Sequence, residues 1–201
     1  MANVNVLIPF YSRDGSVEKL ANAVAEGAKS AGAEVRLRRV RDLVGPDVMA
    51  KVPGWAENSA RMQAAYPAPT EQDAEWADAV IFGTPTRFGN TSAELKAFID
   101  SLGGLWFQGK LNGKIGSAFT STGTPHGGNE STILSLYNPM AHLGFIIVPI
   151  GYADPLIFKV GTPYGASHVA GNPASPPNED ELSVARFQGR RVTEVAKKLK
   201  A

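Results

Sequence analysis

Three short segments, each rich in hydroxyl side chains or glycines, follow stretches of apolar residues. Their sequences are Tyr-Ser-Arg-Asp-Gly-Ser-Val at 11–17, Thr-Pro-Thr-Arg-Phe-Gly-Asn at 84–90 and Thr-Ser-Thr-Gly-Thr-Pro-His-Gly-Gly at 120–128. Hydroxyl groups and unobstructed backbone N–H groups can bind a phosphate or the polar edge of a flat heterocycle. Arginine or phenylalanine can cover the face of such a ring. Because each segment alone is also compatible with an ordinary turn, its function depends on whether the fold brings the three together.

Composition narrows the chemistry that these segments can perform. The 201 residues include no cysteine, which excludes disulfides, thiolate metal sites, iron–sulfur clusters and a cysteine nucleophile. Any redox activity would therefore need an organic cofactor or a non-thiolate metal site, and we predict no metal ligands. A net charge of +1 gives no electrostatic indication of nucleic-acid binding.

Hydrophobic patterning predicts alternating strands and helices. Strands are expected at 4–10, 34–40, 79–83, 115–119 and 145–150. Helices are expected from a cap at Ser16 to Gly32, and at 71–78, 92–102, 130–143 and 179–200. The proline-rich segments 45–70 and 152–178 are interpreted as irregular insertions in one domain, 1–201. We expect them to expose apolar side chains at an interface, among them Trp55, Tyr66, Ile157 and Phe158. This alternation predicts a doubly wound parallel sheet, in which ligands bind beyond the C-terminal ends of the strands, where all three segments would lie.

Two common nucleotide sites are absent from the sequence. No Gly-Lys-Ser or Gly-Lys-Thr follows the first strand, which argues against a P-loop, and no Gly-x-Gly-x-x-Gly fingerprint indicates a dinucleotide fold. Residues 12–17 instead suit a mononucleotide phosphate at the N-terminus of a helix.

Taken together, these motifs resemble the WrbA family of flavodoxin-like NAD(P)H:quinone oxidoreductases. The resemblance runs from Val4 to about Leu199. It also includes Gly103-Gly104-Leu105-Trp106, Val148-Pro149-Ile150-Gly151-Tyr152 and Gly161-Thr162-Pro163-Tyr164-Gly165-Ala166. The resemblance implies a flavodoxin-like five-stranded parallel sheet of order 2-1-3-4-5 with helices on both faces. It also implies a bound FMN, NADH or NADPH as electron donor, a quinone as acceptor and a homotetramer.

The resemblance also assigns residues to the site. It places Trp106 in the substrate cavity and His142 near the flavin, the two expected catalytic positions. Cofactor contacts are expected from His142 and from the three loops: Ser12, Arg13, Asp14, Gly15, Ser16, Val17, Pro85, Thr86, Arg87, Phe88, Gly89, Asn90, Ser121, Thr122, Gly123, Thr124, His126, Gly127 and His142. The chain departs from many members at Asp14, whose carboxylate we expect to repel the phosphate.

Two other functions remain compatible with the sequence. An electron-carrying flavodoxin is one, although such carriers tend to be strongly acidic and this chain is nearly neutral. A flavin-binding regulatory partner without turnover is the other. The sequence has neither a run of about 18 apolar residues nor a basic region followed by an apolar run at its start, so we expect no membrane span and a cytoplasmic location.

Overall fold

A parallel sheet forms the centre of the molecule. The computed structural model describes residues 3–200, and in it the strands lie in the order β2-β1-β3-β4-β5, with β6 also paired to β4. This confirms the flavodoxin-like order 2-1-3-4-5. The strands are β1 (Val4–Phe10), β2 (Ala33–Arg39), β3 (Ala79–Pro85), β4 (Ile115–Thr122), β5 (Ile146–Ile147) and β6 (Ser167–Val169).

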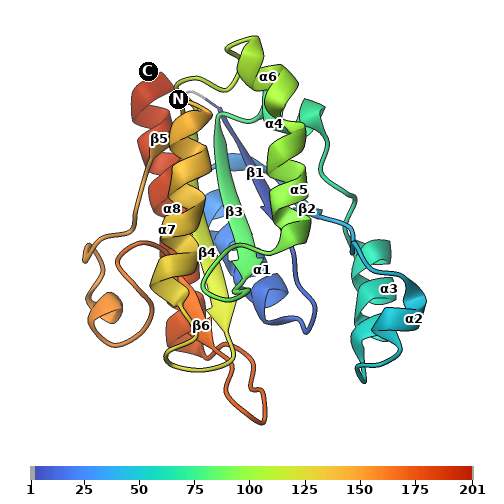
Figure 1. Ribbon diagram of the computed structural model, residues 1–201. Helices are drawn as coiled ribbons and strands as arrows, with labels where there is room; N and C mark the ends of the chain where they lie inside the picture. The colour runs from blue at the N-terminus through green and yellow to red at the C-terminus, as the bar shows by residue number, and fades with distance from the viewer. Residues whose placement is uncertain (1–2, 201) are drawn as a thin grey trace.

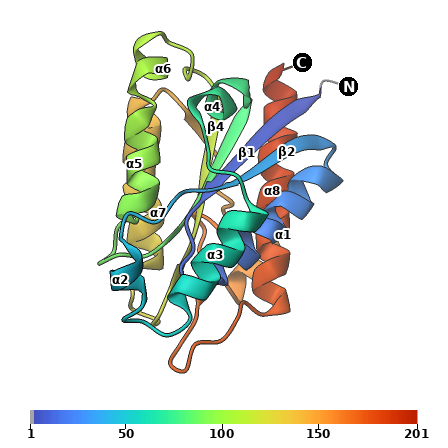
Figure 2. The ribbon, with the colours of Figure 1, turned by 90° about the vertical axis from the view of Figure 1, so that its right-hand side faces the viewer.

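Helices cover both faces of this sheet. Figure 2 shows α5 and α7 on one side and α1 and α8 on the other, with α3 beside the β2 edge. The helices are α1 (Ser16–Ser30), α2 (Pro46–Met49), α3 (Trp55–Ala65), α4 (Glu71–Trp76), α5 (Ala93–Ser101), α6 (Gly103–Phe107), α7 (Asn129–His142) and α8 (Glu179–Lys200). A 3-10 helix, η1, spans Pro155–Phe158. None of the helices in residues 3–200 is long and apolar enough to cross a bilayer.

Two apolar clusters hold the layers together, one on each face of the sheet. Ile8 and Ile81 belong to the cluster under α1 and α8, whereas Leu7 and Val80 belong to the cluster on the other face. Adjacent residues of one strand point to opposite faces, so a strand buried on both faces is continuously apolar. Gly27 of α1 and Gly189 of α8 allow close contact between their helices, because a Cβ on either would lie within 2.0 Å of the other helix's backbone.

The first insertion is more ordered than its composition indicates. Residues 45–70 were expected to be irregular, yet they contain α2 and α3. Only Ser59 and Met62 of α3 are buried. Such a helix lacks the apolar stripe by which amphipathic helices are recognised in a sequence, so the expectation was wrong for a physical reason.

The fifth strand is split into two short pieces. A continuous strand was expected at 145–150, but β5 holds only Ile146–Ile147, which pair with the start of β4, whereas β6 pairs with its end. Val148 still donates its N–H to Gly116, after which Pro149 has no N–H to continue the ladder. The second insertion therefore leaves the sheet and returns to it, and part of the expected loop 152–178 is strand (Figure 1).

Exposure of apolar side chains also differs from expectation in the insertions. Trp55, Tyr66, Ile157 and Phe158 were expected on the surface. Phe158 is exposed, but Ile157 is buried and the other two are partly buried. Insertion residues thus contribute to the core as well as to the surface.

Candidate functional site

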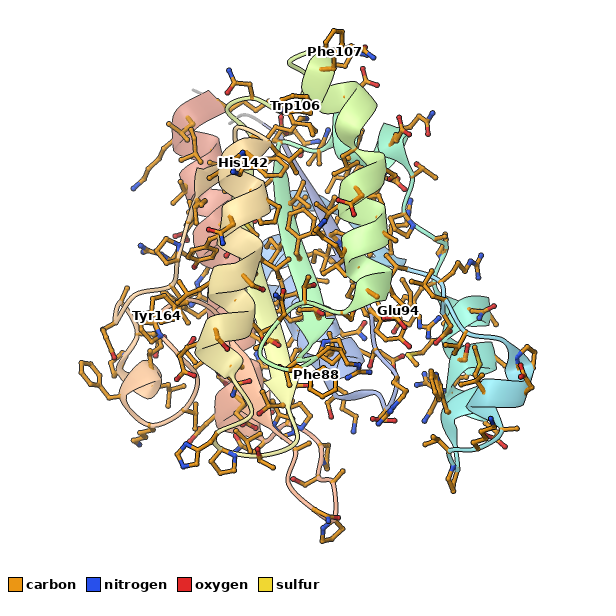
Figure 3. All side chains as sticks on the ribbon, in the orientation of Figure 1. Phe88, Glu94, Trp106, Phe107, His142 and Tyr164 are labelled. Atoms are coloured by element: carbon orange, nitrogen blue, oxygen red, sulfur yellow. The ribbon has the colours of Figure 1, made fainter. Side chains whose placement is uncertain are left out.

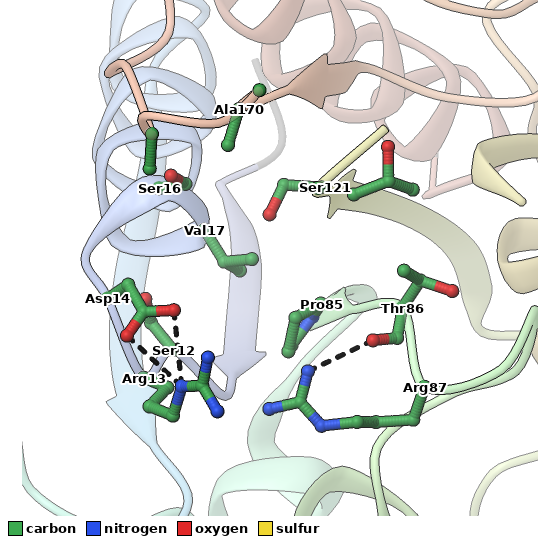
Figure 4. A pocket seen from close by; sticks show the side chains of 14 residues that line it. Ser12, Arg13, Asp14, Ser16, Val17, Pro85, Thr86, Arg87, Ser121 and Ala170 are labelled. Carbon is green, nitrogen blue, oxygen red and sulfur yellow. Dashed lines mark hydrogen bonds and ion pairs between the residues drawn. The ribbon is translucent and has the colours of Figure 1, made fainter. Parts of the chain in front are cut away.

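One cavity joins the three segments at the C-terminal edge of the sheet. Its volume is about 260 Å³, and its wall comes from the ends of β1, β3 and β4 and from the segment after β6. Figure 4 shows Ser12, Val17, Pro85, Thr86, Ser121 and Ala170 around it. The lining is Ser12, Arg13, Asp14, Ser16, Val17, Pro85, Thr86, Arg87, Ser121, Thr122, Gly123, Ala170, Gly171 and Ala174.

The N-terminus of α1 presents unpaired donors to this cavity. Ser16 was expected to cap the helix, but the N-cap is Gly15, with φ of 95° and no side-chain capping bond. Ser12 Oγ accepts the N–H of Gly15 at 3.1 Å and so fixes the turn. The first N–H groups of a helix have no partner within it, and here no cap satisfies them. They are therefore available to an anion, which the helix dipole also favours.

Asp14 does not bring an isolated negative charge to this loop. Arg13 Nε donates to both carboxylate oxygens, at 3.1 and 3.2 Å, and the Asp14 side chain is 57% exposed. Solvent screening and the ion pair both weaken any repulsion of a phosphate. The repulsion of a phosphate that we expect from Asp14 is therefore weak.

Behind the loop lies a buried polar network that sequence patterning did not indicate. Asp42 accepts hydrogen bonds from Tyr11, Arg39, Trp55 and Ser59, at 2.8, 2.8, 3.1 and 2.6 Å. Burial alone would raise the pKa of Asp42, but bonds from Ser59, Arg39 and Tyr11 lower it to about 2.

Arg39 connects this network to the cavity loop. Its guanidinium is 1% exposed and donates from Nη2 to the carbonyl of Ser12 at 3.2 Å. The network therefore joins the first insertion, through Trp55 and Ser59, to the first residue of the loop. These pairings are tertiary, so no local motif could have found them.

Residues 85–90 form a braced turn. Thr86 Oγ1 donates to the carbonyl of Gly127 at 3.1 Å and accepts the N–H of Gly89 at 3.2 Å. Arg87 and Asn90 exchange backbone hydrogen bonds across the turn. Of the expected contacts here, Pro85, Thr86 and Arg87 line the cavity, whereas Phe88, Gly89 and Asn90 lie beyond its wall.

The third segment contributes its first residues to the cavity. Ser121, Thr122 and Gly123 line it, and open space lies where a Cβ on Gly123 would be. Thr124 and His126 are exposed, and Gly127 instead braces Thr86. The structure also adds Ala170, Gly171 and Ala174, which the sequence could not indicate because alanine and glycine carry no binding chemistry of their own.

Trp106 and His142 lie far from this cavity within one chain. His142 ends α7, a helix of 14 residues that begins near the cavity and runs about 20 Å along the sheet. Figure 3 shows Trp106 and His142 at one end of the molecule and Phe88 at the other. Trp106 and His142 line a separate hollow of about 280 Å³. Within one chain, the structure therefore does not bring Trp106 and His142 to this cavity.

Comparison with known proteins supports the same fold and cofactor class. The model of a family described as NADPH-dependent FMN reductase matches residues 6–154. The chain belongs to this family. It is thus a flavodoxin-like oxidoreductase of an FMN-binding class, as the uncapped N-terminus of α1 and the surrounding hydroxyl groups also indicate.

Solved structures are similar over nearly the whole chain. A WrbA-like flavodoxin from Agrobacterium tumefaciens is 26% identical with a TM-score of 0.68, over 98% of this chain and 99% of that one. Flavodoxin 2 from Bacillus cereus is 17% identical with a TM-score of 0.59, covering 95% and 99%. An apo NADH:FMN oxidoreductase is 18% identical with a TM-score of 0.60, covering 96% and 90%.

Proposed function

We propose that this protein carries FMN in the 260 Å³ cavity and transfers two electrons from NADH or NADPH to a quinone. The observation that carries the proposal is the convergence of the uncapped N-terminus of α1 with residues 85–87 and 121–123. A cavity of this size suits a mononucleotide better than a dinucleotide. The quinone as acceptor is supported by the motif resemblance to the WrbA family and by the similarity to the WrbA-like structure.

Each wall of the cavity has a distinct task in this proposal. The N–H groups after Gly15 and the Ser16 hydroxyl hold the phosphate, while Arg13 supplies a nearby positive charge. Thr86 and Arg87 position the edge of the ring system, and Ser121 and Thr122 offer hydroxyls from the neighbouring strand β4. FMN held by these residues would supply the two-electron redox chemistry, for which the side chains themselves have no group.

Catalytic roles for Trp106 and His142 require a second copy of the chain. Trp106 and Phe107 are 53% and 85% exposed at the end of the molecule opposite the cavity. Exposed aromatic side chains of this kind are typical of interfaces. In the homotetramer that we propose, these residues approach the cavity of a neighbouring copy, where an aromatic wall would hold a flat quinone.

A flavodoxin-type electron carrier is the second candidate function, because carriers share this fold and the cavity geometry does not distinguish them. Purified protein loaded with FMN separates the two. We expect its yellow colour to bleach on anaerobic addition of NADH or NADPH and to return on addition of benzoquinone, over many cycles. Protein that binds FMN but is not bleached by either nucleotide would be a carrier or regulatory partner, and protein that does not bind FMN would contradict both functions.

A further inference from the structure

A buried histidine lies directly behind the segment that closes the cavity after β6. His168 is on β6, and its side chain is only 2% exposed. Its Nδ1 lies 2.9 Å from Oε2 of Glu181 on α8, and its Nε2 lies 2.9 Å from the carbonyl oxygen of Ser175. Both ring nitrogens therefore have a partner. Neither the histidine nor its two partners belong to the three segments that the sequence singled out.

The two partners determine how many protons the ring carries. A backbone carbonyl such as that of Ser175 can only accept a hydrogen bond. Oε2 of Glu181 also accepts the N–H of Asn178 at 2.8 Å, which favours its ionised form. A neutral imidazole can donate from one nitrogen only, so two acceptors at 2.9 Å require the doubly protonated, positively charged ring.

A continuous series of hydrogen bonds connects this ring to the cavity wall. Ser175 donates its N–H to the carbonyl of Ala170 at 2.7 Å, and Ala170 donates its own N–H to the carbonyl of Thr122 at 2.8 Å. Ala170 and Thr122 line the cavity, as do Gly171 and Ala174 within the same turn. The bond from His168 to Ser175 thus holds the closed end of this turn. On the other side of the turn, Ala170 lines the cavity (Figure 4).

We infer that His168 is a positioning residue for the cofactor: its second ring proton holds residues 170–175 as a wall of the cavity, and loss of that proton weakens FMN binding. This inference rests on the proposed function, because it assigns FMN to that cavity. Without the proton on Nε2, a nitrogen lone pair would face the Ser175 carbonyl oxygen, and the two would repel each other.

The direction of the pH effect follows from the groups around the ring. Burial alone would lower the pKa of His168, but hydrogen bonds to Glu181 and Ser175, with the charge of Glu181, raise it above 6.5, against a small opposing effect of Lys19 on α1. The stabilising contribution of the charged ring is therefore fully present well below pH 6.5, and the bond from Nε2 to Ser175 is lost as the pH rises through the higher pKa of the folded protein. FMN, by ordering the wall, should raise that pKa further.

Two measurements on one set of samples test the inference. Long-range ¹H–¹⁵N NMR spectra of protein labelled at its three histidines report the charge of His168 between pH 6 and 9, with and without FMN. Quenching of FMN fluorescence gives Kd between pH 7 and 9, above the second phosphate pKa of about 6. A difference of one pKa unit between the two forms would make Kd rise about tenfold across the titration of His168.

Three variants separate positioning from general stability. H168Q removes the cation, E181Q removes its carboxylate partner, and D180N removes an adjacent exposed carboxylate of the same helical turn. We expect H168Q to bind FMN about tenfold more weakly at pH 7, with no further loss as the pH rises. E181Q should lower the pH midpoint at which His168 loses its proton in the NMR spectra, and the rise in Kd should move to lower pH with it. D180N should keep the midpoint and the pH dependence of Kd seen in the wild type.

The outcomes are distinct from those for the proposed function. A His168 that is neutral at pH 6.5, an H168Q variant with wild-type Kd at pH 7, or a midpoint that FMN leaves unchanged would overturn the inference. If H168Q does not fold, the wild-type spectra and E181Q still decide it. Protein that fails to bind FMN at any pH would overturn the proposed function as well. The two failures can be told apart, because the NMR spectra recorded without FMN still report the charge of His168.

Discussion

Phe88 has the left-handed backbone conformation, with φ of 54°, and its ring is fully exposed. A residue with a Cβ loses about 1 kcal/mol in this region relative to glycine, and nothing in the fold packs on the ring to compensate. We expect the free energy of unfolding in urea to be about 1 kcal/mol higher for F88G than for F88A. Equal stability of the two variants would show that the turn is unstrained.

Asp14 and Arg13 form the second residue-scale test. Removing the carboxylate frees Arg13 for the phosphate, so D14N should bind FMN more tightly at low salt, by less than about 1 kcal/mol because the pair is exposed. R13Q should bind more weakly, since it leaves the carboxylate unpaired. Fluorescence titrations at two ionic strengths check both changes, which should shrink as salt rises. Weaker binding by D14N at low salt would contradict the revised electrostatic argument.

At the scale of elements, Asp42 connects the first insertion to β1 and β2. Replacing it with asparagine leaves the buried charge of Arg39 without its counter-ion, which typically costs about 3–5 kcal/mol. We expect D42N to lose that much of the free energy of unfolding in urea, whereas D47N, at an exposed aspartate of α2, should change it by less than about 0.5 kcal/mol. A D42N variant as stable as D47N would show that the network contributes little.

The same carboxylate gives the fold a defined acid sensitivity. Because hydrogen bonds lower the pKa of Asp42 to about 2, its stabilising contribution is fully present above pH 3.8 and is lost as the pH falls toward 2. Urea unfolding between pH 5 and 2 should therefore show a steeper loss of stability in the wild type than in D42N. Parallel curves would indicate that other groups, such as Asp73 with its lowered pKa, dominate acid unfolding.

Elements that bury a whole face were predictable from the sequence, and those held by a few tertiary contacts were not. β1 and α8 show clear apolar patterns, whereas α3 buries only two side chains and β6 is just Ser-His-Val. The cavity loops were predictable because their chemistry is local to each segment and the topology of the sheet brings them together. The bonds of Arg39 to Ser12 and of His168 to Glu181 join different elements of the fold, so composition and spacing carried no signal for them.

At the scale of the whole molecule, the distance between Trp106 and the cavity gives a complementation test. G15V should block FMN, because its φ of 95° disfavours a β-branched residue, and W106A should lose quinone reduction while keeping an intact cavity. If Trp106 acts on a neighbouring copy, unfolding and refolding the two variants together should restore part of the activity. Light scattering of each variant verifies assembly. A refolded mixture as inactive as each variant alone would contradict a role for Trp106 at the cavity of a neighbouring copy.

The short pieces of the split fifth strand also limit how the edge of the sheet can pair with another molecule. An exposed strand edge invites a strand from another molecule, the first step toward fibrous aggregates. On one side, β5 and β6 offer only two and three residues each, separated by an excursion of the chain. On the other side, β2 carries three arginines, and Arg39 gives its N–H to Pro67 of the first insertion. β5 and β6 are too short to act as a template, and the like charges of the β2 arginines oppose pairing with a second copy. Copies of this chain should therefore associate through side-chain surfaces and not by extending one sheet into the next.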